Sequence, residues 1–354
     1  MKVLHVAETV KGGVATYLNL LSHVTDAQCT NVFLLPENQR TYIESESIGF
    51  SSTGRGVSGL LSMFKAFYRV YKNDSPDIIF LHSTFAGLLR LFCIINPTLK
   101  DKFVYCSHGW SFNMDKRKII LKLYSAIELC LSWLSAKIVC ISGYEMSEAI
   151  RIGISKRKLI VIYNSLPESY EFDPDFKPDF LTEEQQKYIV FIGRKSQQKG
   201  YDFLDELSRY LPAHYKIVVI GDFEANDFHS DRIIVAGWLS SSKINSILTS
   251  ARALICPSRW EGFGFVVIES FRVGVPVIGS NRGALPELIV PPLNGFTFDL
   301  DNLASTESIF AALDDEAKFR ELKLNAKASF LQRFTAEKFK TSILTLYKDL
   351  QVGK

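Results

Sequence analysis

The sequence predicts an α/β protein built from two doubly wound domains. Short apolar runs with many β-branched residues alternate with helical patterns along most of the chain. Nearly continuous apolar strands are typical of a parallel sheet that helices cover on both faces. The alternation stops over residues 165–187, which contain three prolines and many acidic residues. Because 354 residues suffice for two domains of ordinary size, we interpret this break as a linker between them.

The first domain is expected to comprise residues 1–165. Its strands are expected at 3–7, 31–35, 77–81, 103–107, 137–141 and 159–162. Its helices are expected at 14–21, 59–71, 84–95, 119–134 and 143–150. The first ten residues hold only a short apolar run, interrupted by His and Glu, which predicts a strand rather than a secretion signal.

The linker is expected at 166–187 and the second domain at 188–335, followed by a C-terminal helix within 336–354. Strands of the second domain are expected at 188–192, 216–220, 233–236, 253–256, 275–279 and 295–298. Helices are expected at 200–210, 241–249, 306–333 and 336–350. Doubly wound sheets bind ligands at the carboxyl ends of their strands, and two facing domains would place the ligand in the cleft between them.

The composition indicates a globular protein of the reducing cytoplasm. Hydrophobic residues make up 47% of the chain and charged residues 22%, which excludes a disordered chain. The net charge of +3 argues against a strongly cationic nucleic-acid binder. The six cysteines are scattered, mostly in apolar runs, and form no metal-like spacing. No uncharged run reaches about 18 apolar residues, so no membrane-spanning helix is expected.

The most informative segment holds two acids, Glu261 and Glu269, that flank a glycine-rich turn leading into an apolar run. Gly262 and Gly264 allow positive φ and a close approach of the backbone to a ligand. If a helix begins near Phe265, its free N–H groups and positive dipole end form a phosphate site. Each carboxylate can accept a pair of hydroxyl hydrogen bonds. A nucleotide sugar carries sugar hydroxyls, diphosphate and ribose hydroxyls in this same order. Alone, the turn and either acid have ordinary structural explanations, and it is their order that favours a site.

A second candidate segment is Gly193-Arg194, followed four residues later by Lys199-Gly200, after the strand at 188–192. Two cations between glycines at a strand end suggest a clamp for phosphate groups. Taken alone, the pattern is more often that of two solvated loop cations.

Together these segments resemble the retaining glycosyltransferases of the GT-B type, specifically family 4. The E-x7-E spacing of Glu261 and Glu269 matches the family signature, as do the surrounding PS-x-x-EGFG and G-x-PVI. The G-R-x4-K-G pattern at Arg194 and Lys199 matches as well. The resemblance is strongest over 188–300 and weaker over 1–165. It implies the GT-B fold, two Rossmann-like domains facing across a cleft, and a last helix that crosses back to the first domain.

The resemblance also implies roles for individual residues. Glu269 is expected to hold the ribose of a nucleotide diphosphate sugar, Arg194 and Lys199 its diphosphate, and Glu261 its sugar hydroxyls. His108, which follows the strand at 103–107, is expected to line the pocket of the transferred sugar. The catalytic set is therefore Glu261, His108, Lys199 and Arg194. The further donor-binding residues are Gly12, Gly13, Gly262, Phe263, Gly264 and Phe265. His82, also at a strand end, and His5, inside a strand, are interpreted as structural.

No metal or other cofactor is expected. Many nucleotide-sugar enzymes hold a divalent ion with a D-x-D pair, but Asp173/Asp175 lie in the predicted linker and Asp299/Asp301 follow a late strand. Both pairs are interpreted as solvated or turn acids. The donor is expected to be a UDP-sugar, the commonest donor of the family. The acceptor is expected to be a glycan or a lipid-linked glycan of bacterial surface polysaccharide biosynthesis, in O-antigen, capsule or lipopolysaccharide.

Two alternatives stay open at this level. The chain could be a GT-B sugar-nucleotide epimerase or phosphorylase, or a scaffold that binds nucleotide sugars without catalysis. The basic helix at 117–134 could rest on the cytoplasmic face of an anionic inner membrane. A core-facing helix with a basic outer side is the more ordinary interpretation of the same pattern.

Overall fold

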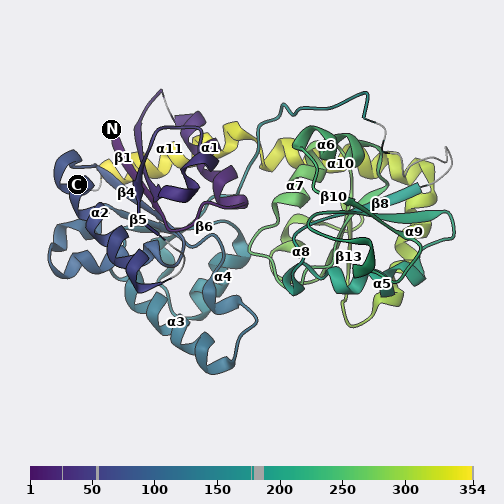
Figure 1. The fold of residues 1–354 in the computed structure, drawn as a ribbon, viewed down its shortest axis with the longest axis horizontal. Helices are drawn as coiled ribbons and strands as arrows, with labels where there is room; N and C mark the ends of the chain where they lie inside the picture. Colours follow the sequence, from purple (N-terminus) through teal and green to yellow (C-terminus); the bar gives the residue numbers. More distant parts are fainter. Residues whose placement is uncertain (26, 53–55, 177, 179–186, 353–354) are drawn as a thin grey trace. The chain divides into compact units, whose positions relative to one another are not determined.

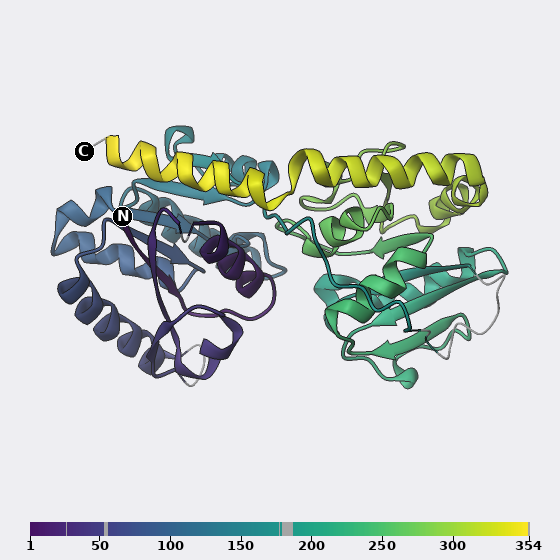
Figure 2. The ribbon, with the colours of Figure 1, turned by 90° about the horizontal axis from the view of Figure 1, so that it is seen from above.

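A computed structural model describes residues 1–25, 27–52, 56–176, 178 and 187–352. The chain divides into two compact units (Figure 1). The first contains residues Met1–Ser165 together with the C-terminal helix α11 (Ala336–Val352), and the second contains Leu166–Thr335. Helix α11, yellow in Figure 2, returns to the first unit and packs beside α1 (Gly13–Thr25). The C-terminal helix is therefore part of the first unit.

The first unit is a parallel sheet with strand order β3-β2-β1-β4-β5-β6-β7. The strands are β1 (Lys2–Ala7), β2 (Thr30–Pro36), β3 (Ser47–Phe50), β4 (Ile78–His82), β5 (Phe103–Cys106), β6 (Lys137–Cys140) and β7 (Leu159–Val161). The central strands β1, β4 and β5 are buried almost throughout, as apolar runs covered on both faces require. Strand β3 was not predicted, because its four residues, SIGF, carry little periodicity and lie at the sheet edge.

The helices of the first unit lie where the sequence predicts them, with different ends. They are α1, α2 (Val57–Asp74), α3 (Lys118–Ser132), α4 (Gly143–Arg151) and α11. The segment predicted as a helix at 84–95 forms a 3₁₀ helix, Ala86–Ile94, rather than an α-helix. Buried Arg90 donates through Nε to Gly87 O at 2.7 Å, a contact between residues three positions apart.

The second unit is a parallel sheet with strand order β10-β9-β8-β11-β12-β13. The strands are β8 (Lys187–Ile192), β9 (Tyr215–Ile220), β10 (Ile233–Gly237), β11 (Ala253–Cys256), β12 (Val277–Ser280) and β13 (Gly295–Phe298). The α-helices are α5 (Leu204–Leu207), α6 (Ser241–Ser250), α7 (Phe265–Arg272), α8 (Leu285–Leu288), α9 (Glu307–Asp314) and α10 (Glu316–Arg333). The order reverses at β8, so that β9 and β11 leave it on opposite sides. Such a reversal creates a crevice at the carboxyl ends of the strands.

Two predicted helices of the second unit are interrupted. The segment 200–210 contains the short helix α5 between two 3₁₀ turns. The segment 306–333 breaks at Asp315, whose carboxylate accepts from the backbone N–H groups of Ala317 at 3.0 Å and Lys318 at 3.2 Å. This side chain starts α10 as an N-cap, so one long periodic pattern contains two helices.

The described part of the predicted linker packs on the second unit. Leu166 N–H donates to Phe334 O at 2.9 Å, and Asn245 donates to Glu171 O at 2.8 Å. Asp173 N–H donates to the Ser246 hydroxyl at 3.0 Å. Residues 177 and 179–186 lie outside the described residues, and Lys187 already belongs to β8.

Candidate active site

The candidate site of the second unit centres on Glu261, in the loop after β11. Its carboxylate is 7% exposed and accepts two hydrogen bonds at Oε1, from Lys199 Nζ at 2.6 Å and from the Ser258 hydroxyl at 3.0 Å. Ser258 is positioned in turn by Ser280, at the end of β12, which donates to Ser258 O at 2.5 Å. The structure therefore brings together Lys199 and Glu261, two of the predicted residues that lie far apart in the sequence.

Gly200 allows Lys199 to reach Glu261. It has φ of +71°, and a Cβ at this position would lie 1.9 Å from Pro257 O. The loop before Gly200 is held against the β11 loop by Arg259 N–H, which donates to Gln198 O at 2.8 Å. Only a residue without a side chain permits this approach, so glycine at 200 sets the position of its neighbour Lys199.

A second glycine contact holds Glu261 from the other side. Gly283, with φ of +60°, follows β12, and a Cβ there would lie 2.4 Å from Glu261 O. Ala284 N–H donates to the same carbonyl at 3.0 Å. The backbone of Glu261 is therefore fixed by the loops that follow β8 and β12, which are both neighbours of β11 in the sheet.

Helix α7 begins at Phe265, where the sequence predicts it. Gly264, at the N-cap position, has φ of 101°, and its carbonyl accepts from Val267 N–H at 3.0 Å. The N–H groups of Phe265 and Val266, in the first turn, point away from the helix body and suit an anionic ligand. Phe263 is buried, with its ring 5.8 Å from that of Phe334, so only its backbone could meet a ligand. Glu269 lies on the second turn of α7 and is half-buried.

The charges of Glu261, Arg194 and Glu269 each interact with that of Lys199. Burial lowers the pKa of Lys199, but the adjacent Glu261 carboxylate outweighs burial, so its pKa is raised overall. Arg194, which is exposed, opposes that rise. Burial raises the pKa of Glu269, against the positive charges of Arg272 and Lys199. Because an ammonium has three donors and Glu261 takes one, Lys199 can also donate to an anionic ligand.

The predicted residues of the first unit lie at the carboxyl ends of β1 and β5. Gly12, with φ of +66°, precedes α1, and both Gly12 and Gly13 are exposed. His108 follows β5, has φ of +55° and is half-buried. Its Nε2 lies 3.0 Å from Nδ1 of His82, and its ring packs edge-on against Tyr17 with centroids 4.6 Å apart.

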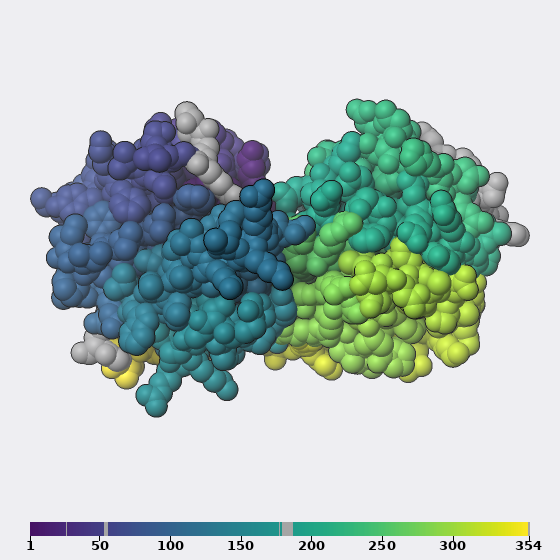
Figure 3. Space-filling view, turned by 90° about the horizontal axis from the view of Figure 1, so that it is seen from below, coloured from purple at the N-terminus to yellow at the C-terminus, as the bar shows by residue number. Residues whose placement is uncertain are grey.

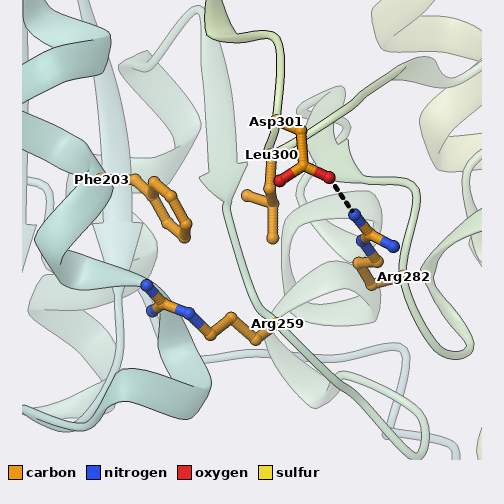
Figure 4. Close-up of a pocket in the computed structure, with 5 residues that line it drawn as sticks. All are labelled: Phe203, Arg259, Arg282, Leu300 and Asp301. Atoms are coloured by element: carbon orange, nitrogen blue, oxygen red, sulfur yellow. Dashed lines mark hydrogen bonds and ion pairs between the residues drawn. The ribbon is translucent and has the colours of Figure 1, made fainter.

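A hollow of about 280 Å³ lies beside the β11 loop and is not lined by the predicted donor residues (Figure 4). Its lining residues are Phe203, Arg259, Arg282, Leu300 and Asp301. Both of its cations are already paired. Arg259 pairs with Asp202 at 2.6 Å, and Arg282 pairs with Asp299 at 3.3 Å and Asp301 at 2.9 Å. The hollow thus holds paired cations, as the site at Lys199 does, but it contains none of the residues that the sequence predicts to bind the donor.

The second D-x-D pair is therefore engaged in ion pairs with Arg282. Over the described ranges, no group of three or more His, Cys, Asp or Glu side chains is arranged to hold a metal ion. Among the helices that the structure describes, none combines the length and apolar character needed to cross a bilayer.

Several residues of the site were not found from the sequence. Ser258 and Ser280 carry the hydrogen bonds that position Glu261, and Arg272 lies close enough to Glu269 to affect its pKa. Tyr17 packs against His108 from α1. A serine in PS-x-x-E could have been noticed as part of the motif. Arg272 could have been found as well, because it lies three residues after Glu269 on the same helix. Ser280 and Tyr17 depend on how distant segments pack and have no local signal.

Two units, each built on a parallel sheet of the Rossmann type, define the GT-B fold. The same fold is found in Anabaena Alr3699/HepE, whose crystal structure is in complex with UDP and glucose. The two share a TM-score of 0.81 and 18% identity, and the match covers 99% of this chain and 100% of that one.

The chain belongs to the family 4 glycosyltransferases. The model of glycosyltransferase family 4 matches residues 11–169, and that of the glycosyl transferases group 1 matches 173–329. The uncharacterized 41.2 kDa protein in the cps region of Klebsiella pneumoniae is 33% identical over 97% of this chain and 96% of that protein. The Escherichia coli UDP-Gal:alpha-D-GlcNAc-diphosphoundecaprenol alpha-1,3-galactosyltransferase is 24% identical over 81% of this chain and 79% of that protein. The predicted fold class, family and enzyme class are confirmed.

Proposed function

We propose that this glycosyltransferase moves a sugar, with retention of configuration, from a UDP-sugar to a hydroxyl of a lipid-linked glycan acceptor. The observation that carries the proposal is the buried contact of Lys199 with Glu261 at 2.6 Å, beside the start of α7. UDP is the nucleotide bound to the Anabaena protein, and the name of the E. coli relative gives UDP-Gal as donor and a diphosphoundecaprenol-linked sugar as acceptor. The K. pneumoniae relative is encoded in a cps region, which supports a role in bacterial surface polysaccharide synthesis.

The donor is held by the second unit in this proposal. Glu269 accepts hydrogen bonds from the ribose hydroxyls, and Glu261 accepts them from hydroxyls of the sugar. Lys199 and Arg194 donate to the diphosphate, and the backbone of the Gly262–Phe265 turn with the first N–H groups of α7 adds further donors.

The reaction exchanges one glycosidic bond for another on the same face of the sugar. The bond from the anomeric carbon to the diphosphate oxygen breaks, and its electron pair leaves with the diphosphate. The acceptor oxygen bonds to the anomeric carbon from that same face, and its proton passes to an oxygen of the departing phosphate. Lys199 and Arg194 stabilise the charge that grows on the leaving group, so no metal ion is required. Glu261 positions the sugar and forms no covalent bond to it.

The first unit supplies the acceptor side. Gly12 and Gly13 offer backbone N–H groups at the start of α1 as hydrogen-bond donors for anionic oxygens. His108 contacts a hydroxyl of the transferred sugar. Exclusion of water around the bound donor limits wasteful hydrolysis.

The direct test is a thermal-shift screen of nucleotide sugars, followed by assay of nucleoside diphosphate release with and without a lipid-linked acceptor. We expect stabilisation by UDP-sugars, release of UDP only with acceptor, full activity in EDTA and an anomeric NMR signal that retains the donor configuration. Release without acceptor, or interconversion of free UDP-sugars, would instead indicate a hydrolase or an epimerase. An inverted product would disprove retention.

We also propose that α3 rests on the cytoplasmic face of an anionic membrane, where a lipid-linked acceptor would be found. Ile119, Leu123 and Ile127 repeat every four residues on its outer face and are 76%, 58% and 38% exposed. Exposed lysines and arginine surround the start of this stripe, at residues 116–118 and 122. Figure 3 shows the face of the first unit on which α3 lies, in teal-blue. Apolar side chains bordered by cations suit a surface of anionic lipid headgroups.

Vesicle co-sedimentation tests this surface. The double variant Ile119→Ser/Leu123→Ser is expected to lose binding to vesicles that contain phosphatidylglycerol, and high salt is expected to weaken wild-type binding. Val57→Ser/Leu61→Ser is the matched control, because these residues are 74% and 57% exposed at the same spacing on α2. Equal binding by both double variants would exclude α3 as the membrane contact.

A further inference from the structure

Three histidines form a hydrogen-bonded chain through the first unit and end at the predicted sugar pocket. His5 on β1 lies with Nδ1 3.2 Å from Nε2 of His82, at the end of β4. His82 Nδ1 lies 3.0 Å from Nε2 of His108, in the loop after β5. Successive rings are tilted by 27° to each other, with centroids 5.4 Å and 5.2 Å apart. The chain therefore joins neighbouring strands of the sheet to the one histidine with a proposed role.

At the end of this histidine chain away from His108, the hydrogen bonds of Thr25 and Asn31 fix which nitrogen of His5 carries the proton. The Thr25 hydroxyl donates its only proton to Leu21 O at 2.8 Å, so it accepts from the Asn31 amide nitrogen 2.9 Å away. This orients the Asn31 side chain and turns its Oδ1 toward Nε2 of His5, at 3.2 Å. Because Oδ1 can only accept, His5 must carry its proton on Nε2.

The position of the proton on His5 determines the positions of the protons on His82 and His108. A neutral imidazole has one N–H, so His5 Nδ1 is bare and accepts from Nε2–H of His82. His82 Nδ1 is then bare and accepts from Nε2–H of His108. The proton of His108 is thereby placed on Nε2, and its Nδ1 is left as an acceptor. Within the described residues, Nδ1 of His108 makes no hydrogen bond.

The chain requires that His5 and His82 be neutral, since a second proton on either ring would set one N–H against another. His108 must also be neutral, because only an unprotonated Nδ1 can accept a hydrogen bond. Burial supplies this condition. It lowers the pKa of His5 to about 4 and that of His108 to about 3. It also lowers the pKa of His82, and the two neighbouring rings lower it further. At neutral pH the chain therefore has one arrangement of protons.

We propose that Asn31, His5 and His82 are positioning residues that hold His108 in its Nε2–H tautomer, so that Nδ1 accepts a hydrogen bond from a hydroxyl of the transferred sugar. The proposal rests on the proposed function, because it takes the sugar to be the partner of His108. It adds a requirement of its own: the group of the sugar that faces Nδ1 must be a hydrogen-bond donor. A hydroxyl satisfies this requirement, whereas a fluorine of similar size does not. A purely structural chain would hold His108 in the same tautomer, but kcat/KM would not depend on that tautomer.

The decisive measurement is the tautomer of His108. In protein labelled with ¹⁵N-histidine, long-range ¹H–¹⁵N correlation spectra distinguish a protonated Nε2 from a protonated Nδ1, and loss of signals in His108→Ala assigns the ring. We expect Nε2–H in the wild type without any ligand. A protonated Nδ1 would overturn the proposal, and would do so whether or not the protein transfers sugar.

Variants of His82 and Asn31 then test whether the hydrogen-bonded histidine chain sets the His108 tautomer. The amide of His82→Gln can accept from His108 and donate to His5, so it keeps the direction of the chain, whereas His82→Leu cannot. We expect His82→Leu and Asn31→Leu to give mixed His108 tautomers and to lower kcat/KM about tenfold, the loss of one hydrogen bond. We expect His82→Gln to restore both the tautomer and kcat/KM. Ser22→Ala, which removes a buried hydroxyl 2.7 Å from Ser45 Oγ elsewhere in this unit, controls for general loosening.

Fluorinated donors complete the test. One deoxyfluoro analogue in a positional series is expected to lose about tenfold in kcat/KM with the wild type and almost nothing with His82→Leu. If every analogue loses activity equally in the wild type and in His82→Leu, the chain is structural only. If no nucleotide sugar binds or reacts while the wild-type tautomer is Nε2–H, the proposed function fails together with the sugar as partner of His108. The control of the His108 tautomer by His82, His5 and Asn31 then still stands.

Discussion

Replacing Gly200 by alanine is expected to inactivate the enzyme without unfolding it. The new Cβ would lie 1.9 Å from Pro257 O, and ordinary contacts begin near 3.4 Å, so the loop must retreat by about 1.5 Å. A retreat of that size would take Lys199 Nζ from 2.6 Å to about 4 Å from Glu261 Oε1, beyond hydrogen-bonding distance. Misplacement of a reacting group by about 1 Å lowers rates about 100-fold, and we expect a loss of kcat of that order.

Gly274→Ala is the matched control for this variant. Gly274 has φ of +75°, close to the +71° of Gly200, but its nearest backbone contact is an ordinary 3.4 Å. Both alanines pay the same conformational strain of about 1–2 kcal/mol, which urea unfolding measures. Only Gly200→Ala should also lose acceptor-dependent UDP release. Equal activity of the two variants would show that the close approach to Pro257 does not position Lys199.

Three further predictions address the charged groups. Lys199→Ala is expected to lower kcat by about 100-fold, while Glu269→Ala mainly raises the Kd for UDP in calorimetry, since one acts on the leaving group and the other on the ribose. Glu128→Gln leaves the buried Arg90 guanidinium, 2.9 Å away, without its anion, and is expected to lower the free energy of unfolding by about 3–5 kcal/mol in urea. Stability should also fall as the pH drops from 6.5 toward 4, because the folded pKa of His5 is about 4 and the unfolded chain therefore binds more protons in this range. The expected slope is about 1.4 kcal/mol per pH unit for each such histidine.

Each of these has a result that would contradict it. Wild-type turnover by Lys199→Ala would remove the phosphate-clamp assignment. A stability loss after Glu128→Gln no larger than that after Glu148→Gln, which breaks a surface pair with Arg151, would show that burial of the pair does not matter. A flat free energy of unfolding between pH 7 and pH 4.5 would mean that the buried histidines titrate normally.

The alternation of apolar strands and helices was enough to predict the sheets and most helices. The alternation did not predict elements whose bounds depend on tertiary contacts or on a single capping side chain. Strand β3 has four residues and is defined by its pairing with β2, and the pattern at 306–333 hides the cap at Asp315. The segment 166–176 has the composition of a linker, yet it hydrogen-bonds to α6 because backbone groups near a folded surface find partners there.

The amino-acid sequence by itself determined the class of fold, the family and the residue types of the donor site, because these depend on periodicity and on short motifs. Only the tertiary structure decided which distant side chains meet: Lys199 with Glu261, and His5 with His82 and His108. It also decided that Ile119 and Leu123 face outward, which helical periodicity alone leaves open. The physical reason is that a contact between strands depends on their order and register in the sheet, and these are set by packing over the whole unit rather than by neighbours along the chain.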